Sequence, residues 1–259
     1  MSALRYISLV SIGSILYTLI VMLAEVGPYY NLYHIQKGDK IHYAIWDWEF
    51  FNGASITFFS FTCQASILPI YTELVNPNKR RMTKVIGRSL LIDCIFYCSI
   101  ANVGYFSTLG DTPDLVIARP SLDPNRPDYA MTVSCLAVIL VVLVSSPANY
   151  FPFKNTLNYM VTGTTEVSTK FNIVCTSIFC AMTCFLSVVF PNVKSALSIT
   201  GGFSSVTMCY LVPLICWVKL SDKKWYQGSN IIYVVFFLAL SIIGFISVVV
   251  TVVGFFPKK

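Results

Sequence analysis

Long runs of apolar residues, separated by shorter polar segments, repeat along the whole chain. A helix that crosses a lipid bilayer needs about 17 to 25 such residues, and seven runs reach that length. They cover residues 4–23, 51–74, 89–109, 129–151, 171–190, 195–220 and 231–255. Because the apolar residues are continuous and do not alternate with polar ones, the pattern predicts membrane-spanning helices and not the strands of a barrel.

The composition supports this interpretation. Hydrophobic residues make up 56% of the 259 residues and charged residues only 12%, whereas an ordinary soluble domain carries roughly a quarter charged residues. A soluble fold of this size leaves too much surface in water to conceal that much apolar area. We therefore predict an all-α integral membrane protein with about seven spans, in which residues 1–259 form one transmembrane domain. A disordered chain, a disulfide scaffold and a nucleic-acid-binding protein are excluded.

Lysine and arginine are distributed unevenly between the two sides of the predicted membrane. With the N-terminus in the cytosol, the cytosolic side holds eleven basic residues and the opposite side seven. The densest group lies in residues 79–88, and the two longest connections, 25–49 and 110–128, lie on the outer side. Since cytosolic loops carry an excess of Lys and Arg, we predict a cytosolic N-terminus and a C-terminus on the opposite side.

The nine cysteines and two histidines give no sign of a metal centre. The cysteines lie in apolar runs, none forms a CxxC pair, and no Cys/His cluster has metal-ligand spacing. No Ser/His/Asp, Cys/His or paired-carboxylate arrangement is visible either. We therefore expect no enzyme and no cofactor.

Polar residues interrupt the second apolar run. Asn52-Gly53 stands near its start, Ser60–Ser66 near its middle and Pro69 near its end. One interpretation is a broken helix, whose freed carbonyls and hydroxyls bind an ion or an amino acid. The other is a proline kink with Ser and Thr bonded back to their own helix. Both remain open, and the candidate substrate-binding residues of this segment are Ser60, Thr62, Cys63 and Gln64.

The fourth run ends in a second polar segment. Ser145, Ser146 and a backbone opened by Pro147 would supply the oxygen ligands that a cation such as Na⁺ requires, and Asn149 follows as a candidate substrate-binding residue. Small residues that allow close helix packing are the equally weighted alternative.

Two further features favour structural roles. The small residues of Ser198–Thr207 in the sixth run favour close packing between helices. Asp93 is the only acid well inside a predicted helix, and we expect it to pair with Arg88.

The segment from Phe61 to Met82 resembles the sixth helix, and the cytosolic loop after it, of the amino acid/auxin permease family. The sodium-coupled neutral amino acid transporters are the most similar branch. The likeness continues in order at Gly104-Tyr105-Phe106, at Ser145-Ser146-Pro147, at Phe151-Pro152-Phe153 and from Gly201 to Leu220.

This resemblance implies a LeuT-like fold of eleven helices in two inverted repeats, with substrate and ion at the membrane midplane. The seven runs correspond to helices 5 to 11, so helices 1 to 4 have no counterpart here. Ser145 stands where the family has a Na⁺-ligating Thr. The family often has His where this chain has Gln64. The resemblance therefore does not extend to the pH-dependent behaviour of that His.

The leading hypothesis is therefore a secondary transporter of neutral amino acids, coupled to Na⁺ or H⁺, in a shortened or split form completed by a second chain. The alternative is a degenerate half-permease that serves as an accessory subunit of a larger membrane complex. A fragment of a longer gene product is a third possibility, against which Met1 argues weakly. The family fits the plasma membrane or a vacuolar or lysosomal membrane, and an accessory subunit would also fit the mitochondrial inner membrane.

Overall fold

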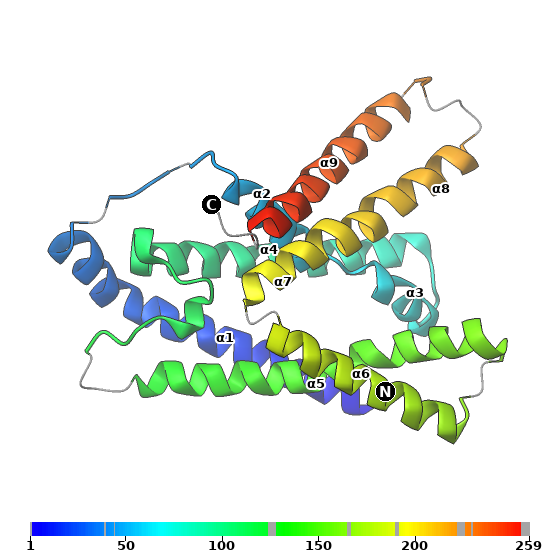
Figure 1. The fold of residues 1–259 in the computed structure, drawn as a ribbon, viewed down its shortest axis with the longest axis horizontal. Helices are drawn as coiled ribbons and strands as arrows, with labels where there is room; N and C mark the ends of the chain where they lie inside the picture. The colour runs from blue at the N-terminus through cyan, green and yellow to red at the C-terminus, as the bar shows by residue number, and fades with distance from the viewer. Residues whose placement is uncertain are drawn as a thin grey trace. The chain divides into compact units, whose positions relative to one another are not determined.

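The computed structural model describes residues 2–38, 40–43, 45–123, 128–164, 167–189, 192–221, 226–228 and 230–254. Within these ranges all regular structure is helical (Figure 1). This confirms the prediction of an all-α protein. Some positions named above lie outside the described residues, among them Phe190 and Phe255, with which two predicted spans end.

The longer helices are α1 (Ser2–Tyr30), α2 (Glu49–Ser60), α3 (Gln64–Glu73), α4 (Lys79–Thr108), α5 (Tyr129–Thr162), α6 (Thr169–Val189), α7 (Val193–Thr200), α8 (Val212–Leu220) and α9 (Asn230–Gly254). Short 3-10 turns form η2 (Leu109–Asp111) and η3 (Val116–Ala118). Wider π turns form η1 (Asn31–Gln36), η4 (Gly201–Ser205) and η5 (Thr207–Leu211).

Six continuous helical stretches in the described chain are long and apolar enough to cross a membrane. They are Leu9–Gln36, Lys79–Asp111, Tyr129–Thr162, Thr169–Val189, Val193–Leu220 and Asn230–Gly254. The remaining predicted span, residues 51–74, is divided into α2 and α3. The protein is thus an all-α integral membrane protein with one interrupted helix.

Several helices extend beyond the predicted spans, α5 for example to Thr162, and two of these extensions run into predicted loops. Residues 25–36, assigned to an outer loop, continue the first helix through η1. Residues 79–88, assigned to a cytosolic loop, form the first turns of α4. The reason is that charged and aromatic residues at a membrane interface remain compatible with helix, so a loss of apolar character marks the edge of the bilayer and not the end of the helix.

Side-chain caps fix several helix ends. The carboxylate of Asp128 accepts a hydrogen bond from the Met131 N–H at 2.9 Å and starts α5. Gly163 ends that helix with a φ of 70°, the left-handed conformation that glycine adopts without steric cost. Asn192 caps α7 in the same way as Asp128, through the Ser195 N–H at 3.3 Å.

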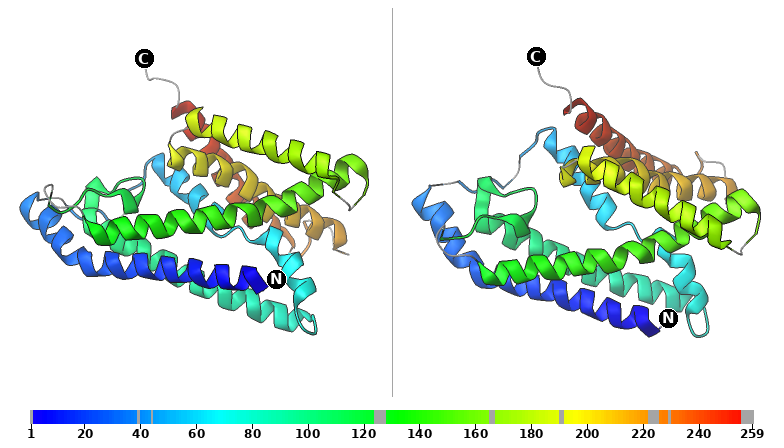
Figure 2. Two further views of the ribbon diagram at one scale, coloured as in Figure 1. Left: turned by 90° about the horizontal axis from the view of Figure 1, so that it is seen from below. Right: turned by 60° about the horizontal axis from the view of Figure 1, so that its bottom comes forward.

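The chain divides into two compact units, and each is described by itself. The first unit comprises residues 1–42 and 94–189. In it α1 lies beside α5 (Figures 1 and 2). Val21, Met22 and Met131 form one buried cluster between these helices. Tyr29, Tyr33 and Leu109 form a second cluster at the far end of α1.

The segment after α4 covers that end of α1 inside the first unit. The buried guanidinium of Arg119 pairs with Glu25. It also lies 4.1 Å from the centre of the Tyr29 ring. The Tyr29 hydroxyl donates to the carbonyl of Pro120 at 2.8 Å. A buried ion pair, a cation–π contact and a hydrogen bond therefore fasten this segment to α1.

The second unit comprises residues 43–93 and 190–259. In it α2 packs on α7, η4 and α9. Glycines allow these backbones to approach closely. A Cβ atom added to Gly201 would lie 2.1 Å from the carbonyl oxygen of Ser55, and one added to Gly202 would lie 2.5 Å from that of Gly244. The small residues of Ser198–Thr207 thus serve close packing, as the sequence favoured.

Candidate functional site

The helix formed by residues 49–73 is interrupted at Phe61-Thr62-Cys63, between α2 and α3. Cys63 has φ −124° and ψ 2°, which is not helical. Within a membrane each backbone group freed by a break needs another partner. The Thr62 hydroxyl meets part of this need by donating to the carbonyl of Phe58 at 2.9 Å.

The side chain of Gln64 meets another part. Its Oε1 accepts a hydrogen bond from the Cys63 N–H at 3.1 Å. The thiol of Cys209, on η5, donates to the same oxygen at 2.9 Å and lies 3.7 Å from the Thr62 hydroxyl. Since an N–H can only donate, the atom next to it must be the amide oxygen, which leaves the amide nitrogen of Gln64 directed elsewhere as a donor.

Each of the two interpretations of the polar residues in run 51–74 is therefore partly correct. The helix is broken, as the first interpretation requires. The hydroxyls of Ser60 and Thr62 also bond back to their own helix, to Ile56 and Phe58 at 2.9 Å each, as the second requires. The break lies before Pro69 in the chain.

The structure brings Thr62, Cys63 and Gln64 together with Cys209 in the second unit. Ser60 lies one turn earlier, at the end of α2. Cys209 was not predicted as a site residue, because a single thiol in an apolar run looks like any buried cysteine. The only signal in the sequence was its place in the stretch from Gly201 to Leu220, which carries the family resemblance.

Ser145, Ser146 and Asn149 belong to the first unit and are exposed within the described structure. They lie on α5, which continues through Pro147. Both serine hydroxyls donate to the carbonyl of Val142, at 3.2 and 2.8 Å. The helix is thus continuous at this proline, and the predicted opening of the backbone is limited to the hydrogen bond that Pro147 cannot donate.

These residues are still compatible with a cation. A hydroxyl that donates its proton to a carbonyl keeps lone pairs for an ion. Pro147 has no N–H, so the carbonyl of Leu143 lacks its usual helical donor. Three oxygens within one turn of α5 can thus serve as part of a ligand set for Na⁺, with further ligands required from elsewhere. No group of three His, Cys, Asp or Glu side chains in the described chain could hold a metal ion.

Asp93 does not form the expected ion pair with Arg88. The ion pairs among the described residues are Lys37–Asp111, Arg119–Glu25 and Lys194–Glu49. Asp93 is exposed on α4, so the explanation of this acid as part of an ion pair with Arg88 is not supported.

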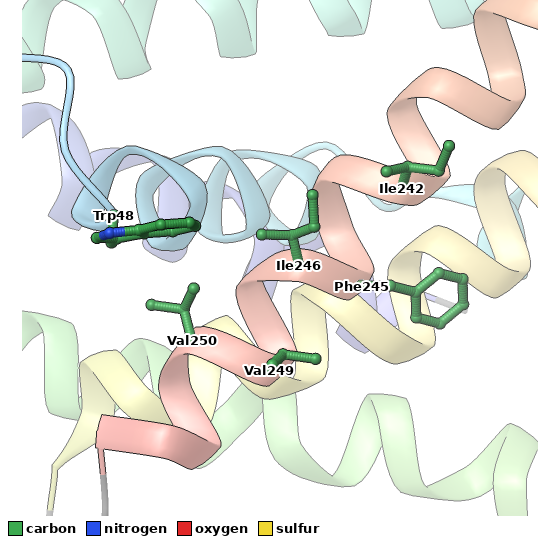
Figure 3. Close-up of a pocket in the computed structure, with 6 residues that line it drawn as sticks. All are labelled: Trp48, Ile242, Phe245, Ile246, Val249 and Val250. Carbon is green, nitrogen blue, oxygen red and sulfur yellow. The ribbon is translucent and has the colours of Figure 1, made fainter.

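An apolar groove of about 320 Å³ lies between the start of α2 and α9 in the second unit (Figure 3). Ile246 and Val250 of α9 point toward the Trp48 ring. Its lining residues are Trp48, Ile242, Phe245, Ile246, Val249 and Val250. Because no polar side chain lines it, this groove lacks the groups that would orient an amino acid.

A set of membrane-spanning helices with one polar, interrupted helix is typical of proteins that carry small polar solutes across a bilayer. Comparison with known proteins identifies the family. The chain belongs to the family described as transmembrane amino acid transporter protein, which it matches over residues 1–256. This family and the relatives named below are transporters and not enzymes.

Individual relatives carry a more specific name. The sodium-coupled neutral amino acid transporter 4 of Homo sapiens is 23% identical over 187 residues, which cover 72% of this chain and 34% of the relative. The Rattus norvegicus protein of the same name is 25% identical over 213 residues, covering 82% and 39%. The chain thus spans little more than a third of the length of these relatives. No solved structure matches it.

Proposed function

We propose that this protein takes part in the secondary transport of neutral amino acids, coupled to Na⁺ or H⁺, and that the interrupted helix α2–α3 forms one side of the substrate site. The observation that carries the proposal is the break at Phe61–Cys63, where a thiol, an amide and a hydroxyl meet in an otherwise apolar chain. Polar groups are costly inside a bilayer, so they mark the path of a polar substrate.

The chemistry of the break fits an amino acid. The amide nitrogen of Gln64 is a donor for a carboxylate. The first N–H groups of α3 point along the helix axis toward the break, where they carry the positive end of the helix dipole. The carbonyls at the end of α2 carry the opposite sign and suit an ammonium group. A zwitterion therefore meets both of its complements at one interruption.

Na⁺ is proposed as the coupling ion because Ser145, Ser146 and the Leu143 carbonyl offer oxygen ligands on α5. The further ligands, and the other wall of the substrate site, would come from additional helices in the same polypeptide or in a second chain. A LeuT-like arrangement of inverted repeats, with the N-terminus in the cytosol, accommodates both requirements.

The direct test is uptake of labelled alanine into proteoliposomes. The full chain is solubilised gently and reconstituted with any protein that co-purifies, and an inward Na⁺ gradient is compared with choline and with a proton gradient. We expect accumulation that depends on one of the two ion gradients. Gln64→Leu should reduce it, and so should Gln64→Glu, which keeps an acceptor for the Cys63 N–H but replaces the amide donor with a second carboxylate.

The opposite result is equally informative. Recovery of the chain in fixed ratio with unrelated subunits, together with no uptake under any gradient, would contradict transport. It would support the accessory role in a larger membrane complex.

A further inference from the structure

A small polar cluster joins the first turn of α2 to α9 in the second unit. Oδ1 of Asn52 accepts hydrogen bonds from the hydroxyls of Ser247, at 3.1 Å, and of Thr251, at 3.0 Å. The Thr251 hydroxyl also lies 2.9 Å from the carbonyl of Ser247, so it divides its single proton between two acceptors. Ser247 is fully buried and Thr251 nearly so.

Close packing around this cluster leaves little freedom for α2 to shift. Ser55, one turn after Asn52, is fully buried beneath Gly201 and Gly202 of η4. A Cβ atom added to Gly244 of α9 would lie 2.3 Å from Val206. The three segments α2, η4 and α9 are therefore held at the closest spacing that their backbones allow.

The other half of the interrupted helix is held differently. Within the described chain α2 packs extensively on α7, η4 and α9, whereas α3 packs extensively on no element. Its beginning is tied to η5 by the contact between Gln64 and Cys209. The interruption thus separates a fixed half from a half with few neighbours.

We propose that Asn52 is a positioning residue for substrate recognition: by fastening α2 to Ser247 and Thr251 of α9, it fixes where the end of α2 and the break stand. Asn52 precedes Ser60 by eight residues, or about 12 Å along a helix, so it acts through α2 and does not touch the substrate. This inference rests on the proposed function, because it gives α9 a part in positioning the same substrate site.

The loss of this contact has a definite kinetic consequence. When only a fraction of the molecules hold a site in its competent position, the apparent affinity falls by that fraction. From the usual strength of interhelical hydrogen bonds in membranes, the loss of two predicts a rise in KM of roughly five- to tenfold. A merely structural role would lower the amount of folded protein, and with it the maximal rate, while leaving KM unchanged.

The first experiment compares Asn52→Leu with Asn52→Asp in alanine uptake, corrected for the amount of protein. Leucine keeps the approximate size and removes the acceptor, whereas aspartate keeps it. We expect KM to rise five- to tenfold for Asn52→Leu and less than twofold for Asn52→Asp. Ser241→Ala is the matched control, because Ser241 is buried on the same helix and its hydroxyl donates within that helix, to the Phe237 carbonyl at 2.8 Å. An unchanged KM in Asn52→Leu would overturn the proposal.

A second variant separates positioning from chemistry. Asn52→Cys combined with Ser247→Cys replaces the hydrogen bond with a disulfide, confirmed by mass spectrometry of the linked peptides. If α2 must stay on α9, the oxidised protein transports with the wild-type KM and the reduced protein with a raised one. Oxidised protein that binds but no longer transports would show that α2 has to leave α9, and would overturn the proposal.

Failure of the proposed function is recognised separately. If the wild-type chain carries no alanine under any gradient, the transport role fails, and the positioning role at that site fails with it. The contribution of the Asn52 hydrogen bonds to stability is then measured by thermal unfolding in mild detergent. Equal Tm values for Asn52→Leu, Asn52→Asp and wild type would show that the cluster does not hold α2 at all.

Discussion

The contacts inside the first unit differ in kind from the contacts inside the second. In the first, the segment after α4 is fastened to α1 by the Arg119–Glu25 ion pair, the Tyr29 ring and two apolar clusters. In the second, α2, η4 and α9 meet through glycines and through hydroxyls that bond to Asn52. The distinguishing contacts are a buried guanidinium in the first unit and close backbone approach with interhelical hydrogen bonds in the second.

The difference follows from the surroundings. Between helices in lipid the hydrophobic effect gives little attraction, so close approach of small residues and interhelical hydrogen bonds hold the second unit together. Near the membrane surface, aromatic and charged side chains find both apolar and polar surroundings, and they hold the end of α1. The four variants that follow test this division, beginning with the largest expected effect.

Arg119→Gln should cost the most. Removing one partner of a buried ion pair leaves a carboxylate uncompensated, and a second one, Asp128, lies close to Glu25. We expect the free energy of unfolding to fall by about 3 kcal/mol, seen as a lower Tm in mild detergent. Lys37→Gln is the control, since its pair with Asp111 is exposed and should contribute less than about 1 kcal/mol. Equal effects of the two variants would remove the distinction between buried and exposed pairs.

Gly201→Ala is the corresponding change in the second unit. The added methyl group would overlap the Ser55 carbonyl, which is backbone and cannot rotate away. We expect a loss of about 2 kcal/mol from overpacking, again measured by thermal unfolding. Gly87→Ala on α4 is the control, because a Cβ there meets nothing within 4 Å. If both variants unfold at the same temperature, close backbone approach does not hold this unit.

Gln64→Leu tests the interruption itself. It leaves the Cys63 N–H without its side-chain acceptor, so we expect the free energy of unfolding to fall by about 1 kcal/mol. Gln64→Glu keeps an oxygen in that place and should lose less. Hydrogen exchange of the Cys63 amide is the local measurement, and it should accelerate in the leucine variant alone. Equal exchange in both variants would contradict the role of this side chain as the acceptor for the Cys63 N–H.

Ser145→Ala should have the smallest effect on stability, below about 0.5 kcal/mol, because the residue is exposed. If Na⁺ is the coupling ion, the Na⁺ concentration for half-maximal uptake should rise several-fold. Ser99→Ala is the control, since Ser99 also donates its hydroxyl to a carbonyl of its own helix, that of Ile95 at 2.7 Å. A Na⁺ dependence that stays unchanged in Ser145→Ala would remove this serine from the site.

The sequence predicts the membrane helices well because a bilayer demands long apolar runs. It does not reveal which run is interrupted. Residues 51–74 and 129–151 both combine Ser or Thr with proline, yet only the first is broken, and not at its proline. α5 continues through Pro147, although the Ser145 and Ser146 hydroxyls bond to Val142 and the Leu143 carbonyl lacks its helical donor. The break in the other run depends in part on Cys209, which is 145 residues away from Gln64.

The candidate site was predictable to the same extent. Thr62, Cys63 and Gln64 were identified because polar residues stand out in an apolar run, and they do lie together. Cys209 could not be identified in this way, because its role comes from a contact and not from its residue type. Asn52 was visible as a polar residue, but its partners Ser247 and Thr251 look like ordinary small residues of a membrane helix.

The π turns η4 and η5 have a consequence for the length of the chain. A π turn holds one residue more than an α turn. Deleting one residue there would restore an ordinary turn and leave α8 facing nearly the same way, because the extra residue is the one removed. Deleting one residue of α8 before Trp217 would instead rotate Trp217 by about 100°, away from Asn230, to which it donates at 3.2 Å, and from the Tyr233 ring. Residues 201–211 are therefore the place where the chain can lose a residue without turning the helix that follows.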